Sequence, residues 1–395
     1  MKKSVNDLAL FGGAPAFEQP LHVGGPNTGD RERFLRRVND LLDRRWLTNK
    51  GPYVLELERK IAEFTGAKHC IAMCNGTIAL EIAIRALGLT GEVIVPSFTF
   101  IATAHALKWQ EITPVFCDID PVTHAIDPKL VEELITERTT GIIGVDLWGK
   151  PCAIEELQEI ARKHDLKLLF DAAHAFGVSY KGKMIGNFGD AEAFSFHATK
   201  FFNTLEGGAV VTNDDALALK IRLMKNFGFS GIDHVVSVGT NGKMNEISAA
   251  MGLTQLEDID QLINTNRRHY KEYKQGLAGI DGIRVMNYDV SEKANYQYIV
   301  IDVDERAFGT GRNRLVEILK AENIFARRYF YPGCHKMEPY RSQGAPVNLP
   351  VTERVSARVI SLPSGSAVGP EAIAKICEVI RLIGAQEHNC GRGHM

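Results

Sequence analysis

The sequence lacks the features that mark disulfide-rich, metal-binding or membrane-spanning proteins. Its seven cysteines are scattered, with no C-x-x-C pair and no histidine pair at zinc spacing, so neither a disulfide framework nor a metal site is expected. No apolar stretch approaches the roughly 18 residues of a membrane helix, and the first residues contain no signal-peptide core. We therefore expect a cytoplasmic protein with free thiols, no metal and no membrane partner.

An excess of charge of one sign is also missing. The chain has 46 Lys and Arg against 48 Asp and Glu, and neither sign forms a long run. A nucleic-acid partner recognised by bulk charge is therefore not expected. The chain is long and rich in apolar residues, with 395 residues and 45% hydrophobic content. This length exceeds what one hydrophobic core usually supports.

Short β-branched runs alternate with helical patterns from about residue 68 onward. The runs are Cys70–Cys74, Val93–Val95, Pro114–Cys117, Gly141–Leu147, Leu166–Asp171, Ala191–Phe196 and Ala209–Thr212. The helical patterns are Thr77–Leu87, Ile101–Trp109, Leu130–Thr136, Ile154–His164 and Asp215–Asn226. This alternation predicts an α/β fold with a large, mostly parallel sheet covered by helices.

The pattern changes in the last third of the chain. One long helical stretch without proline covers Met244–Leu277 and is of the kind that bridges two units. After it we predict strands at Ile283–Val285, Tyr296–Val303 and Phe325–Phe330, and helices at Arg314–Ala321, Val355–Leu362 and Glu371–Ile383. We therefore expect a large domain over 1–260 that includes an N-terminal arm, a small α+β domain over 261–387, and a disordered tail over 388–395.

Polar residues follow three of the predicted strands, where ligands of open α/β sheets bind. Asn75-Gly76-Thr77 stands between a strand and a helix, which suits either a phosphate cradle or an ordinary helix cap. Asp171 ends an apolar strand, where it either caps the next segment or pairs with a cation. Lys200 follows the strand-end Ser195 by five residues and precedes a glycine pair, whereas a lone loop lysine is normally only solvated.

These three features in this order are the parts that hold pyridoxal 5'-phosphate (PLP). The lysine forms an imine with the cofactor, the acid keeps the pyridine nitrogen protonated, and the cradle holds the phosphate. Each part alone is a weak signal, but the ordered set indicates a PLP enzyme.

Five motifs carry a resemblance to a known family over about residues 8–383. They are Gly76-Thr77-Ile78-Ala79-Leu80, Pro96-Ser97-Phe98-Thr99-Phe100, Asp171-Ala172-Ala173-His174-Ala175, Phe194-Ser195-Phe196-His197-Ala198-Thr199-Lys200 with Glu206-Gly207-Gly208, and Gly239-Thr240-Asn241-Gly242-Lys243-Met244-Asn245. The chain resembles the DegT/DnrJ/StrS family of sugar-nucleotide aminotransferases, PLP enzymes of fold type I.

The resemblance implies a role for each matching residue. Lys200 matches the Schiff-base lysine, Asp171 the acid at the pyridine nitrogen, and His174 the polar residue near the 3-hydroxyl, where many members have glutamine. The family's phosphate ligands are matched by Gly76, Thr77 and Ser195. The residue that stacks on the cofactor ring is matched by Phe100. Asn245 matches a phosphate ligand supplied by the partner subunit, which implies a homodimer with shared active sites.

The resemblance also implies the reaction. The resemblance is strongest to enzymes that aminate dTDP-4-keto-6-deoxy-D-glucose at C-4, with L-glutamate as the donor. The segments that carry this closer resemblance include Asn226-Phe227-Gly228-Phe229 and Tyr329-Phe330-Tyr331-Pro332. The diphosphate of such a nucleotide-linked 4-ketosugar needs cationic donors. Our candidates are Lys243, Arg328 and Arg341, each of which is otherwise a surface charge.

Three alternatives stay open at this point. The enzyme could be a 3-aminotransferase on a related ketosugar, or a 3-dehydratase, although the dehydratase branch has histidine where this chain has Lys200. The third alternative, of another class, is a PLP-bound sensor without turnover. No helix-turn-helix segment or basic surface accompanies the intact site motifs, which favours the enzyme.

Overall fold

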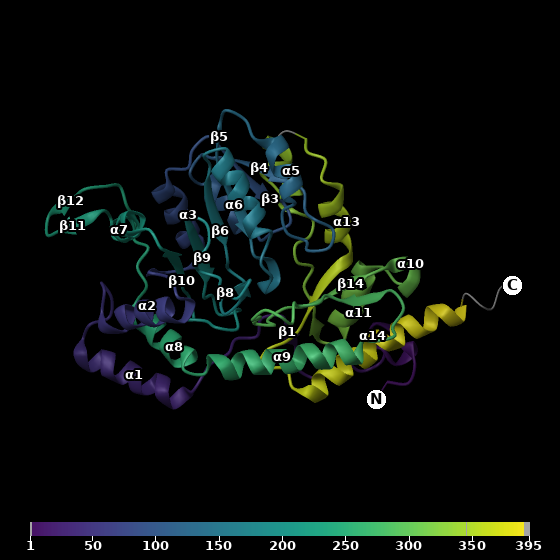
Figure 1. Cartoon of the computed structure of the whole chain (residues 1–395). Helices are drawn as coiled ribbons and strands as arrows, with labels where there is room; N and C mark the ends of the chain where they lie inside the picture. Colours follow the sequence, from purple (N-terminus) through teal and green to yellow (C-terminus); the bar gives the residue numbers. More distant parts are fainter. Residues whose placement is uncertain (1, 345, 391–395) are drawn as a thin grey trace.

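A computed structural model describes residues 2–344 and 346–390 and has a large mixed sheet at its centre (Figure 1). The seven strands follow the order β2-β10-β9-β6-β5-β3-β4. Their bounds are, in that order, His69–Met73, Gly208–Thr212, Ala191–Ser195, Lys167–Asp171, Thr139–Val145, Glu92–Pro96 and Thr113–Cys117. Strand β10 is antiparallel to both neighbours and the other pairs are parallel. The predicted, mostly parallel α/β sheet is confirmed.

Helices cover both faces of this sheet, because successive residues of a strand point to opposite sides. In β6, Leu168 and Phe170 join a core built with α2, α6 and α8, whereas Leu169 joins a second core built with α3, α4 and α7. The helices are α2 (Pro52–Thr65), α3 (Gly76–Leu87), α4 (Ala102–Lys108), α6 (Ile154–Lys163), α7 (Asp215–Met224) and α8 (Glu246–Leu256). Burial on both faces explains why the strands are apolar without alternation.

A smaller antiparallel sheet lies in the C-terminal part of the chain. Its strands are β13 (Ile283–Val285), β14 (Ile299–Val303) and β16 (Val359–Leu362), with β14 in the middle. The helices around it are α9 (Ile259–Gly276), α11 (Arg312–Ala321) and α14 (Pro370–Cys390). A third core, with Tyr273, Ile301, Leu319 and Ile380 among its members, joins these elements.

Two predictions for this region are wrong in whole or in part. The helix predicted over Val355–Leu362 is present only through Arg358, where α13 (Pro350–Arg358) ends, and β16 begins at Val359. The strand half pairs with β14, Ile360 opposite Ile301, so sheet pairing overrides a short pattern that fits either structure. Phe325–Phe330 is not one strand either, because β15 contains only Ile324–Phe325 and the chain then turns, with the Tyr331 N–H donating to the Arg328 carbonyl.

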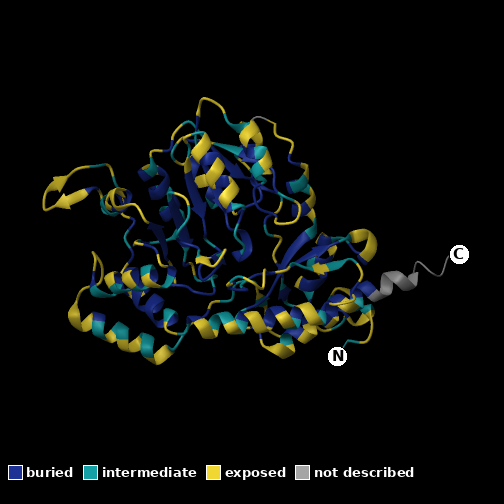
Figure 2. Ribbon diagram, viewed as in Figure 1, coloured by how far each residue is buried: buried dark blue, intermediate teal, exposed yellow. Residues whose placement is uncertain are grey.

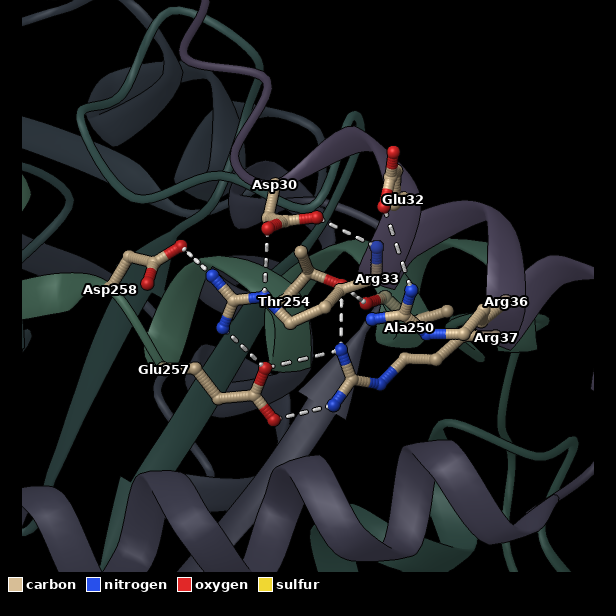
Figure 3. A network of polar contacts seen from close by, with 9 residues as sticks. All are labelled: Asp30, Glu32, Arg33, Arg36, Arg37, Ala250, Thr254, Glu257 and Asp258. Carbon is tan, nitrogen blue, oxygen red and sulfur yellow. Dashed lines mark hydrogen bonds and ion pairs between the residues drawn. The ribbon is translucent and has the colours of Figure 1, made fainter.

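The long helix predicted over Met244–Leu277 is broken in two, as α8 and α9, at Glu257 and Asp258. Both carboxylates are held by arginines of α1 (Arg31–Arg44), as Figure 3 shows. Arg33 contacts Glu257 at 3.0 Å and Asp258 at 2.5 Å, and Arg37 contacts Glu257 at 2.5 Å. These ion pairs anchor α1, for which the sequence analysis predicted no element, against the joint between α8 and α9.

The N-terminal residues, expected with the first domain, pack on the C-terminal sheet region. β1 (Leu21–His22) pairs in parallel with β15, and Leu8 belongs to the third core. The carboxylate of Glu322 accepts hydrogen bonds from the N–H groups of Ala9 and Ala16 at 2.6 and 2.7 Å. The domain division at residue 260, with the arm in the first domain, stays a prediction.

The prediction of a disordered tail over 388–395 is wrong for residues 388–390, because α14 continues through Cys390. The rest of that tail lies outside the described residues. Within the described ranges, no helix combines the length and apolar character that a membrane crossing needs. The hairpin of β11 (Phe229–Gly231) and β12 (His234–Val235) projects from the body and is almost wholly exposed (Figures 1 and 2).

Candidate active site

A pocket of about 550 Å³ opens where the carboxyl ends of β2, β6 and β9 meet. Seven of the residues predicted for the cofactor site line it together: Gly76, Thr77, Phe100, Asp171, His174, Ser195 and Lys200. They come from four separate segments of the chain. The fold therefore brings together residues whose grouping the sequence only suggested.

The N-terminus of α3 supplies unpaired backbone donors to this pocket. Asn75 caps the helix, because its Oδ1 accepts from the N–H of Ile78 at 2.8 Å. The first N–H groups of a helix have no partner within it, and no group in residues 2–344 or 346–390 accepts from those of Gly76 and Thr77. Together with the helix dipole they form a site for a phosphate or another anion. The cap is confirmed, and the phosphate cradle stays a prediction that these free N–H groups support.

Close backbone packing requires glycine beside this helix start. A Cβ on Gly76 would lie 2.8 Å from the Cβ of Ser195, and a Cβ on Gly208 would lie 2.6 Å from the carbonyl carbon of Asn75. Any side chain at either position would push β9 or β10 away from α3. The two glycines therefore keep Ser195 next to the helix N-terminus.

Asp171 is a buried carboxylate without a cationic hydrogen-bond partner among the described residues. Its Oδ2 accepts from the Thr103 hydroxyl at 2.7 Å, and its Oδ1 accepts from the N–H of Ala173 at 3.2 Å. Burial raises the pKa of Asp171, because removal from water disfavours the charged form. A cationic group of a ligand in the pocket would offset that cost.

His174 presents a neutral ring to the same pocket. Its Nδ1 accepts from the backbone N–H of Trp148 at 3.1 Å, so the proton of the neutral ring is on Nε2. Burial lowers the pKa of His174 well below its usual value. The ring packs 4.5 Å from that of Tyr298, centroid to centroid, which fixes its orientation.

Lys200 lies in a loop that β9 and β10 close. The Phe196 N–H donates to the Gly207 carbonyl at 2.8 Å, and the Lys200 N–H donates to the His197 carbonyl at 2.8 Å. The ammonium is 3.4 Å from the Tyr298 hydroxyl, and removal from water lowers the pKa of Lys200 to about 8. A fraction of the Lys200 amine is therefore neutral, and able to act as a nucleophile, near physiological pH.

That pKa predicts how Lys200 reacts. Only the neutral amine is nucleophilic, so reaction with a small aldehyde should rise with pH and level off above about 8; at pH 7 about a tenth of the plateau rate is expected. The rate is measured by trapping with borohydride and quantifying the Lys200 peptide by mass spectrometry. A midpoint near 10 would show that the pocket leaves Lys200 like a solvated lysine.

The four remaining predicted residues do not line the pocket of their own chain. Arg341 pairs with Glu338 at 2.6 Å, Arg328 donates to Oδ1 of Asn313 at 3.1 Å, and Lys243 lies 4.7 Å from the ring centroid of Phe227. Asn245 is exposed and caps α8, where its Oδ1 accepts from the N–H of Ser248 at 2.8 Å.

The pocket also contains residues that the sequence analysis missed. Arg327 lines it in place of its neighbour Arg328, and Tyr298, Tyr329 and Phe330 complete its wall. The arginine pair was visible in the sequence, but nothing local distinguished its two members. The backbone of Arg327 forms an isolated bridge with Ser361 of β16, and Arg327 lines the pocket.

Comparison with known proteins agrees with this geometry. Residues 29–381 match the model of the DegT/DnrJ/EryC1/StrS aminotransferase family. A dTDP-4-amino-4,6-dideoxy-D-glucose transaminase of Shigella dysenteriae is 39% identical over 93% of this chain and 100% of its own length. The crystal structure of DesI with its TDP-sugar product superposes with a TM-score of 0.93 at 47% identity, covering 99% of this chain and 100% of the other.

A third relative was solved with a form of the cofactor named in its description. It is a sugar aminotransferase of Streptococcus pneumoniae in its PMP form, with a TM-score of 0.86, 26% identity, and coverage of 95% of this chain and 100% of the other. The chain described here belongs to the DegT/DnrJ/EryC1/StrS aminotransferase family.

Proposed function

We propose that this chain is a PLP-dependent aminotransferase that converts dTDP-4-keto-6-deoxy-D-glucose to dTDP-4-amino-4,6-dideoxy-D-glucose, with L-glutamate as the amino donor. The observation that carries the proposal is the meeting of Lys200, Asp171 and the free N-terminus of α3 in one pocket. The transaminase of Shigella dysenteriae and DesI, which is described with a TDP-sugar product, support the substrate.

The residues of the pocket fit PLP. The N–H groups of Gly76 and Thr77 and the hydroxyl of Ser195 suit its phosphate. The carboxylate of Asp171, which has no cationic hydrogen-bond partner among the described residues, suits a protonated pyridine nitrogen. His174, Phe100 and Tyr298 provide polar and aromatic walls. When bound, PLP supplies an electron sink that stabilises negative charge at the carbon next to the transferred nitrogen.

Each residue has a separate task in this proposal. Asp171 keeps the electron sink in its protonated form, and Thr103 orients that carboxylate. The amine of Lys200 would hold the cofactor and, once released, would move a proton from Cα of the donor to C4' of the cofactor, and in the second half of the reaction from C4' to the aminated sugar carbon. Arg327, which has no ion pair in the described part of the chain, suits an anionic group of a substrate.

Absorption spectroscopy tests the first half of the reaction. The purified protein should show a visible absorption band from bound cofactor, and L-glutamate alone should remove it without any sugar present. A PLP-bound sensor without turnover would keep the band, and a protein that binds no PLP would lack it.

We further propose that two subunits share each site, with Asn245 reaching the cofactor phosphate of the partner. Its exposed position outside its own pocket supports this arrangement. Asn245→Ala and Lys200→Ala should each be inactive as homodimers. After subunit exchange, a hybrid carries one site with both residues intact, so up to about half of the activity per hybrid should return.

The exchange experiment needs a control for hybrid formation, which differently tagged subunits and native mass spectrometry provide. As a negative control, Lys200→Ala subunits that carry one tag are mixed with Lys200→Ala subunits that carry the other tag. These hybrids should stay inactive. Proven hybrids without any activity would refute the shared site.

A further inference from the structure

A second cavity, of about 160 Å³, lies where the loop after β4 meets the C-terminal sheet. His124 lines it from that loop, Arg284 and Asp302 from β13 and β14, and Arg354 and Arg358 from α13. None of these residues lines the active-site pocket. The proposed aminotransferase function uses none of them.

Positive charge is in excess around this cavity. Asp302 accepts from Arg358 Nε at 2.7 Å and from Arg284 at 3.0 Å, and Asp304 pairs with Arg358 at 3.3 Å. Two carboxylates thus face three guanidinium groups. Arg354 is exposed and forms no ion pair within residues 2–344 and 346–390. A guanidinium has five N–H donors; Arg358 uses three of them in these contacts and Arg284 uses one.

His124, one of the lining residues, contains an unpartnered polar atom. The residue is only 3% exposed, and its Nδ1 has no hydrogen-bond partner in the described part of the protein. Burial lowers the pKa of His124 to about 4, so the ring is neutral at physiological pH. Such an orphan is rare, because an unmet buried polar group is costly.

We propose that this cavity binds a phosphate or phosphoryl dianion. Guanidinium groups donate paired N–H bonds to phosphate oxygens, which favours this anion over a monovalent one. The volume of about 160 Å³ is sufficient for one tetrahedral group.

The site is in contact with the rings that surround the active site. His124 packs against Phe98 at 6.1 Å and Trp148 at 5.4 Å between centroids. Phe98 in turn packs 6.0 Å from Phe330, which lines the active-site pocket, and Trp148 donates its N–H to His174. An anion bound here would connect the loop after β4 to the C-terminal sheet, next to the catalytic pocket. Its binding should therefore stabilise the folded protein.

Titration of the PLP-loaded protein with inorganic phosphate, at constant ionic strength, tests the proposal. The thermal midpoint should rise to a plateau, as for a single site. Arg354→Gln and Arg284→Gln should each weaken the apparent affinity about tenfold or more, because each removes a charge-assisted contact. Arg306→Gln is the matched control, an exposed arginine of α10 (Glu305–Phe308) outside both cavities, and should change the affinity less than about twofold.

Two further arms identify the source of the dianion. If Arg354→Gln weakens the response to phosphate but not to dTDP, the ligand is free phosphate; if it weakens both, the terminal phosphoryl group of a nucleotide binds as well. An unsaturable response, or one that is equal in the wild type and all three variants, would overturn the proposal. Neither result bears on whether the protein is an aminotransferase, which the glutamate assay tests separately.

Discussion

Replacing Lys200 by alanine is expected to lower turnover by more than about a thousandfold, because in the proposed function one amine both holds the cofactor and moves the protons. The structure places that amine in the pocket, 3.4 Å from the Tyr298 hydroxyl and in the same cavity as Asp171. Turnover is measured by release of 2-oxoglutarate from glutamate in the presence of the ketosugar.

Two further variants make this result specific. Lys320→Ala removes an exposed lysine of α11 and should keep wild-type turnover. Lys200→Arg keeps the positive charge but offers no nucleophilic amine, so it should be as inactive as Lys200→Ala. A Lys200→Ala protein that folds and turns over at near the wild-type rate would refute the role given to this residue.

The second large effect is expected at Asp171. Asp171→Asn keeps the shape of the side chain but removes its charge, so the cofactor nitrogen would lose its counter-ion and the electron sink would weaken. We expect a loss of at least about a hundredfold in turnover, even in protein that retains PLP. Steady-state kinetics on protein with a measured cofactor content provides the test.

Thr103→Val is a milder change in the same hydrogen-bonded pair and serves as the control for Asp171→Asn. It removes the hydroxyl that donates to Oδ2 at 2.7 Å and leaves the carboxylate in place. Its loss should be about tenfold, in line with one hydrogen bond to a charged group. If Asp171→Asn stays within a few-fold of the wild type, the carboxylate only caps the turn after β6.

The sequence predicted most of the cofactor site because its residues are local to strand ends. Asp171 is the last residue of β6, Ser195 is the last of β9, and Gly76 begins α3 directly after β2. Parallel strands place such ends on one edge of a sheet. The order of the motifs was therefore sufficient to predict that they meet.

The substrate side was less predictable because long-range packing decides it. Arg327 and Arg328 are neighbours, and only the pairing of Arg327 with Ser361 selects which of them lines the pocket. That pairing depends on β16, in a segment predicted as a helix. Arg341 looked equally suitable in the sequence, but Glu338, three residues earlier, neutralises it.

The N-terminal part of the chain shows a third limit of structure prediction from the sequence. α2 begins at Pro52 and ends at Thr65, just before the capping Gly66, and this boundary signal was present in the sequence. The parallel pairing of β1 with β15 joins residues about 300 positions apart, and no local pattern specifies such a contact.

The central claim is amination at C-4 of a nucleotide-linked ketosugar. The most direct measurement is incubation of the PLP-loaded protein with dTDP-4-keto-6-deoxy-D-glucose and L-glutamate, followed by NMR assignment of the carbon that carries nitrogen. We predict dTDP-4-amino-4,6-dideoxy-D-glucose, with the nitrogen on C-4. An untouched 4-keto sugar together with amination of its 3-keto isomer, or loss of the C-3 hydroxyl without amination, would contradict the account.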